Sequence, residues 1–130
     1  MKALAAAAAA LALTGCAALG PKPALPADFT AATVPLYCMS AEQCMLYWQR
    51  AQVWIANNSR WKIQLATDTL IETYNGVGES RDPGFRLLRV PQSNGWQELE
   101  LTLACRSMFG CEHDRATYVA SFKRYVRGEL

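Results

Sequence analysis

The chain has 130 residues, of which 52% are hydrophobic and 18% are charged, and its net charge is +2. This length allows one small domain with a modest core. Without Lys2, 12 basic residues remain against 11 acidic ones, a net charge of +1. That balance argues against a nucleic-acid-binding surface or a polybasic lipid-binding surface.

The N-terminus has the pattern of an export signal. Lys2 carries a positive charge and residues 3–13 are continuously apolar, a run too short to span a membrane but typical of a signal peptide over 1–15. The run ends in "LTGC", which resembles the lipobox of bacterial lipoproteins. The resemblance implies that Cys16 becomes the acylated N-terminus, although an ordinary secretory signal with a chance cysteine is the alternative. Ala17, where an aspartate would signal inner-membrane retention, implies the periplasmic face of the outer membrane.

Residues 16–35 are rich in proline and alanine and carry few large apolar side chains. Proline removes backbone donors and favours an extended chain, so this composition predicts a semi-stiff tether. Fully extended, such a tether would reach roughly 60 Å from the membrane. The folded domain is therefore expected over residues 36–130.

Four further cysteines form two clusters with the same spacing, namely Cys38 with Cys44 and Cys105 with Cys111. An even number of cysteines in an exported chain indicates disulfides, with three possible connectivities. Zinc, with His113 as an additional ligand, is the competing interpretation, but structural zinc sites favour cysteines two to four residues apart. A bridge between clusters would stabilise more, about 4.4 against 2.4 kcal/mol for a local ring. Proximity nevertheless favours the local pairs, and we expect those.

The first regular element after the tether is a helix over about 40–58. Ser40 and Gln43 have the spacing of a capping box, and apolar residues follow at helical intervals. Residues 61–68 then alternate as a half-buried strand, and residues 69–75 form a second strand or extend the first. The Gly- and Asp-rich segment 75–84 is expected to be a loop.

Asn94-Gly95 predicts a hairpin between strands at 85–90 and 96–105. Leu99, Leu101 and Leu103 form one row of the second strand, and pairing around a two-residue turn places Leu88 and Val90 beside them. The opposite row then faces solvent as a candidate interface with aromatic, apolar and arginine side chains, namely Phe85, Leu87, Arg89 and Trp96. The alternative is that the 75–84 loop folds over these side chains as part of the core, and a slip of one residue in register would exchange the two faces.

Asp114 can cap a last helix that carries Lys123, Arg124 and Arg127 outward. The predicted fold is α+β: a two-layer sandwich with an N-terminal helix, a three- to four-stranded antiparallel sheet and a C-terminal helix. Both helices are expected to cover the leucine row.

No residues combine into a catalytic motif. His113 lies at a helix start, where capping-region histidines are common, and Asp68 and Glu72 are explained by a solvated strand face. We therefore expect no enzyme activity, no cofactor and no metal, and a membrane-anchored interaction protein with an envelope protein as partner. An inhibitor of a secreted or host hydrolase such as lysozyme is the alternative. The segments "CMSAEQC", "CRSMFGC" and "ASFKRYV" loosely resemble small uncharacterised proteobacterial lipoproteins, a resemblance that implies no activity.

Overall fold

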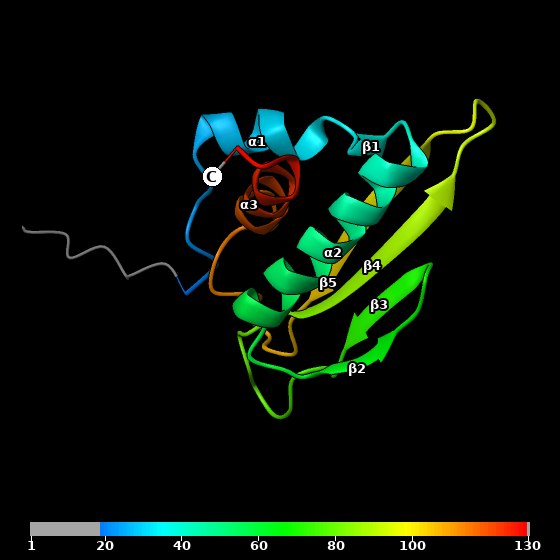
Figure 1. Ribbon diagram of the computed structural model, residues 1–130. Helices are drawn as coiled ribbons and strands as arrows, with labels where there is room; N and C mark the ends of the chain where they lie inside the picture. The colour runs from blue at the N-terminus through cyan, green and yellow to red at the C-terminus, as the bar shows by residue number, and fades with distance from the viewer. Residues whose placement is uncertain (1–18, 130) are drawn as a thin grey trace, which may run out of the picture.

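The computed structural model describes residues 19–129 (Figure 1). Its elements are, in chain order, α1 (Pro26–Thr33), β1 (Tyr37–Cys38), α2 (Ala41–Asn58), β2 (Ile63–Ala66), β3 (Leu70–Thr73), β4 (Gly84–Pro91), β5 (Gln97–Ala104) and α3 (Arg115–Arg127). The strands form one five-stranded antiparallel sheet in the order β1-β5-β4-β3-β2. The α+β prediction is confirmed, with more strands than the three or four expected.

The sheet contains one strand that the prediction lacks, β1, and two strands within residues 61–75. β1 has only two residues, too few to form a recognisable sequence pattern. Residues 61–75 divide into β2 and β3 around a tight turn, in which the backbone N–H of Thr67 donates to the carbonyl of Leu70 at 2.8 Å. The question of one strand or two is thereby answered in favour of two.

The helices α2 and α3 lie on the same side of the sheet and enclose the core (Figure 1). Ser40 caps α2 by accepting from the backbone N–H of Gln43 at 3.1 Å, and the Gln43 side chain accepts in return from the N–H of Met39 at 2.7 Å. The predicted capping box is therefore present in its first bond, and its reciprocal bond goes to the residue before the N-cap. Trp54 of α2 connects the two layers, because its ring lies edge-on to both Phe85 and Phe122, with centroids 5.3 and 5.4 Å away.

The register of the β4–β5 hairpin differs from the prediction by one residue. Leu87 pairs with Leu101 and Pro91 with Gln97. Gln92 and Trp96 form the last pair, so the loop consists of the three residues 93–95 and not of two residues. Gly95 adopts the left-handed conformation (φ 86°) that a three-residue hairpin loop requires. Because side chains alternate along a strand, this shift exchanges the two faces of β4.

Residues 19–35 belong to the folded domain, so the predicted tether is wrong from residue 19 onward. The helix α1 packs against α3, and the buried Asp28 carboxylate receives a hydrogen bond from Arg124 at 2.9 Å. Lys123 was expected to face outward, but it is buried, and its Nζ donates to the carbonyls of Ala32 and Val34 at 2.5 and 2.6 Å. Burial lowers the pKa of this ammonium group.

Candidate functional site

The N-terminal segment is fastened to the start of α3. The backbone N–H of Lys22 donates to the carbonyl of Glu112 at 2.8 Å, and the N–H of Asp114 donates to the carbonyl of Lys22 at 2.9 Å. Lys22 therefore pairs with His113 as a one-residue parallel bridge. The first described residues thus have a defined position against the C-terminal part of the domain.

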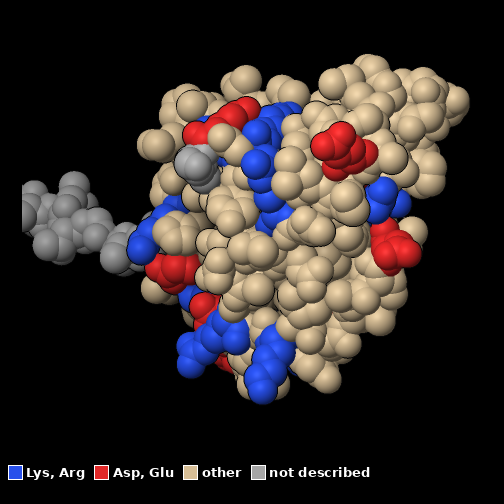
Figure 2. Space-filling view, in the orientation of Figure 1, with Lys and Arg blue, Asp and Glu red and all other residues tan. Residues whose placement is uncertain are grey.

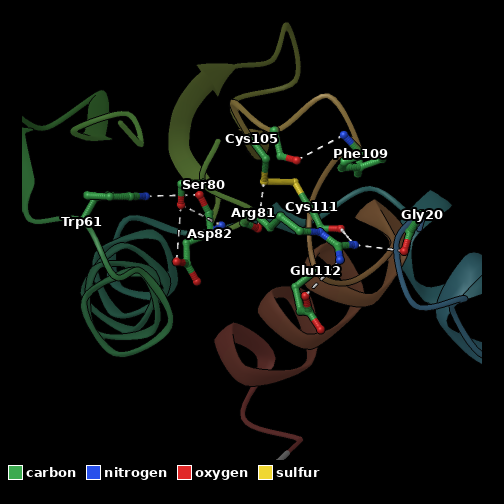
Figure 3. Close-up of a disulfide and its surroundings, with 10 residues drawn as sticks. Gly20, Trp61, Ser80, Arg81, Asp82, Cys105, Phe109, Cys111 and Glu112 are labelled. Carbon is green, nitrogen blue, oxygen red and sulfur yellow. Dashed lines mark hydrogen bonds and ion pairs between the residues drawn. A yellow bond between two sulfur atoms is a disulfide. The ribbon is translucent and has the colours of Figure 1, made fainter. Parts of the chain in front are cut away.

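The side chain of Arg81 also holds the N-terminal segment against the residues that precede α3 (Figure 3). Its Nη2 donates to the carbonyls of Gly20 and Cys111, at 2.9 Å in each case, and its Nη1 lies 3.5 Å from the Glu112 carboxylate. Glu112 also lies 3.1 Å from Lys22 Nζ, and this hydrogen-bonded ion pair lowers the pKa of the Glu112 carboxyl. We call these five residues the Arg81 cluster. It joins three segments that are far apart in the sequence.

The disulfide Cys105–Cys111 closes the loop beside the Arg81 cluster. The backbone of this loop is also bonded to the 76–82 loop, because the N–H of Ser107 donates to the carbonyl of Ser80 at 3.0 Å. Gly110 has a positive φ of 77°. The Pro21 ring packs against it, 3.4 Å from the position that a Cβ atom would occupy. The loop is therefore held in shape by a covalent bond at its base and by contacts on two sides.

The second disulfide, Cys38–Cys44, joins β1 to the first turn of α2. Both of its cysteines are buried in the core. The prediction of two local disulfides is confirmed, and the zinc interpretation is wrong because both pairs of thiols are oxidised to disulfides. Cys16 lies outside the described residues.

The candidate interface predicted from the sequence does not exist as a surface. Phe85 and Leu87 are fully buried beneath the helices, opposite Leu103 and Leu101. Arg89 lies on the same side, where its guanidinium is 5.9 Å from the centroid of the Trp48 ring. Phe85, Leu87 and Arg89 do share one face of β4, as predicted. The one-residue shift of the hairpin turns that face toward the helices, which explains why all three residues were placed on the wrong side of the sheet.

Trp96 is the one predicted interface residue that lies on the helix-free face of the sheet. Its ring is 5.9 Å from that of Tyr37, and the two side chains are 37% and 36% exposed. Tyr37 lies opposite Glu98 in the register of β1 and β5, and Glu98 is in turn opposite Val90. The sequence analysis missed Tyr37 because nothing marked β1 as a strand.

The helix-free face also carries apolar side chains away from this pair. Alternation along β4 places Leu88 and Val90 there, and pairing with β3 adds Leu70 opposite Leu88. Glu100, opposite Leu88, is exposed among them. Aromatic and aliphatic side chains bordered by charges are typical of a protein-binding surface.

The opposite, helix-bearing side is shown in Figure 2, where basic and acidic residues lie in small neighbouring groups around a broad uncharged area over α2.

Within residues 19–129, no three His, Cys, Asp or Glu side chains come together as a metal site. The described helices also include none with the length and apolar character needed to cross a membrane. His113 packs edge-on against the Tyr118 ring, 5.7 Å between centroids. Comparison with known proteins finds no matching family model, curated protein or solved structure.

Proposed function

We propose that this protein is a non-catalytic lipoprotein, anchored through Cys16 to the periplasmic face of the outer membrane, that binds an envelope protein on the helix-free face of its sheet. Two disulfides support an oxidising compartment, which the periplasm provides. The lipobox-like "LTGC" supports the anchor. The exposed Tyr37–Trp96 pair is the observation that carries the binding role.

The position of this pair suits a partner that approaches from the periplasm. Trp96 precedes β5, and Cys105 follows it at the end where the N-terminal segment is fastened. The nine residue-to-residue steps from Trp96 to Cys105, at about 3.4 Å each, separate the two ends by about 30 Å. In Figure 1 the β4–β5 hairpin accordingly points away from the blue N-terminal segment. A lipid anchor near one end would leave the aromatic pair accessible at the other.

Buried aromatic anchors contribute most of the binding free energy at many protein interfaces. The two rings already pack against each other in the free protein. Binding would therefore cost little side-chain conformational entropy at these two residues. Glu98 and Glu100 lie close to the pair, whereas the exposed Arg86 lies farther along the same row of β4, so the surface next to the pair has a negative character. A partner surface with apolar pockets and nearby basic residues would complement it.

Site-specific photo-crosslinking in intact envelopes tests this proposal. A benzophenone amino acid replaces Trp96 in the full-length protein, and Met45, which is exposed on α2, receives the same replacement as a control. We expect one discrete cross-linked product from position 96 and none from position 45. The product should disappear when Tyr37→Ala is added, with the unfolding midpoint unchanged. Equal labelling from both positions, or none from position 96, would reject the binding role.

A further inference from the structure

Four large apolar side chains are exposed at the end of the molecule that holds the Arg81 cluster. They are Leu19, Val77, Met108 and Phe109, which are 64%, 73%, 81% and 44% exposed. Each lies in one of three segments, 19–22, 76–82 and 105–111. These segments form the end of the domain opposite the β4–β5 hairpin (Figure 1). We call these four residues the apolar tips.

The three segments are bonded to one another, so the apolar tips have a fixed arrangement. The N–H of Met108 donates to the Glu79 carboxylate at 3.1 Å, which joins the second loop to the third. Arg81 joins both to Gly20, and Pro21 lies against Gly110. The disulfide Cys105–Cys111 closes the loop that carries Met108 and Phe109.

Most charged groups around the apolar tips are paired with each other, but Arg106, exposed between Cys105 and Ser107, forms no ion pair among the described residues. Lys22 and Arg81 both lie within ion-pair distance of Glu112, and Arg60 lies 3.3 Å from Asp82. One unpaired arginine is far from the cluster of several Lys and Arg side chains that attracts proteins to anionic lipid headgroups. Any contact it makes must depend mainly on the apolar side chains.

The fastened N-terminus determines how far this end can lie from a lipid on Cys16. Gly20 is the first residue held by Arg81. Four residues connect it to Cys16, and a fully extended chain of four residues spans at most about 14 Å. The interfacial region on each side of a bilayer is itself about 5–8 Å thick. An anchor on Cys16 thus keeps the apolar tips next to the headgroups, and the reach of roughly 60 Å expected for a free tether is not available.

We propose that the apolar tips, led by Met108 and Phe109, insert into the interfacial region of the bilayer that carries the lipid anchor. This inference rests on the proposed acylation of Cys16 and adds a second, reversible membrane contact to it. Two contacts define an orientation where one lipid alone would leave the domain free to rotate. The disulfide keeps the inserted loop in shape, and the charge pairs allow insertion into neutral as well as anionic bilayers.

Fluorescence quenching by brominated lipids tests the orientation. Full-length lipidated protein is reconstituted into phosphatidylcholine vesicles whose acyl chains carry bromine, with Phe109→Trp and Met45→Trp as matched variants. Each variant adds one tryptophan at an exposed position, and Met45 lies in the α2 turn near the opposite end of the domain. We expect the added Phe109→Trp emission to shift to the blue and to be quenched, and the added Met45→Trp emission to remain unquenched. Replacing part of the lipid by phosphatidylglycerol should change neither result.

Two outcomes would overturn the inference: an unquenched Phe109→Trp signal, or equal quenching of both variants, which would mean that the domain has no preferred orientation. Circular dichroism and the unfolding midpoint verify that both variants fold. The intact mass of each sample is measured first. A mass without the lipid on Cys16 would reject the anchor and this inference together, whereas a lipidated protein with an unquenched Phe109→Trp signal would reject only the apolar tips.

Discussion

Leu87 and Leu88 are neighbours in β4 that point to opposite faces of the sheet, and truncating each tests which face the helices cover. Leu87 is fully buried opposite Leu101, whereas Leu88 is partly exposed opposite Glu100. Leu87→Ala removes a core side chain and should lower the free energy of unfolding by about 3–5 kcal/mol. Leu88→Ala should cost about 1 kcal/mol, because only part of its surface is buried.

The two variants lose the same atoms from adjacent positions of one strand, so differences in strand propensity cancel. For a domain of this size, 1 kcal/mol corresponds to about 4–8 °C in melting temperature, so Leu87→Ala should melt at least about 12 °C below wild type. Urea unfolding followed by far-ultraviolet circular dichroism gives both free energies. A larger loss for Leu88→Ala than for Leu87→Ala would show that the hairpin has the two-residue turn after all.

Three further predictions concern the contacts that hold the N-terminal segment. Lys123→Met removes two hydrogen bonds from a charged donor to the end of α1, so urea unfolding should show a loss of about 1–3 kcal/mol; an unchanged midpoint would refute this role. The pKa of the Glu112 carboxyl is lowered in the folded state, so its stabilising effect is present above its usual pKa and is lost as the pH falls through the folded value. The stability difference between wild type and Glu112→Gln should therefore vanish in acid, and a difference independent of pH would contradict the ion pair. The double variant Cys105→Ser/Cys111→Ser opens a seven-residue ring and should lose about 2.4 kcal/mol in thermal unfolding, while a loss near zero would show that the contacts of Ser107 and Gly110 suffice.

Local signals in the sequence predicted α2, α3 and the two disulfides well, but not α1. Ser40 and Gln43 placed the start of α2, Asp114 placed the start of α3, and the proximity of the cysteines within each cluster favoured the local pairs. In each case the determining interaction lies within a few residues along the chain. Such interactions leave a readable pattern because both partners occur in one short segment.

The errors arose where distant contacts decide the structure. Asn94-Gly95 is compatible with hairpin loops of two or three residues, and burial of Leu87 rather than Leu88 selects the longer one. The segment of α1 has little amphipathic character, and the contacts that hold it come from α3, among them the ion pair between Asp28 and Arg124, 96 residues apart. Proline at the first helical position and aspartate in the first turn were the available local hints.

If the chain is exported as proposed, the bridge between Lys22 and His113 also imposes an order on its folding. Apart from the bond of Gly20 to Arg81, residues 19–36 make their contacts mainly with β5, α3 and the segment just before α3, which are synthesised last and, on the proposed route, cross the inner membrane last. Contacts this distant in sequence form late because their loop-closure entropy must be offset by structure already in place. The end that would carry the lipid is thus released from the translocation machinery first and locked into the domain last. An acylating enzyme would meet Cys16 on a chain whose neighbouring residues have not yet found their partners.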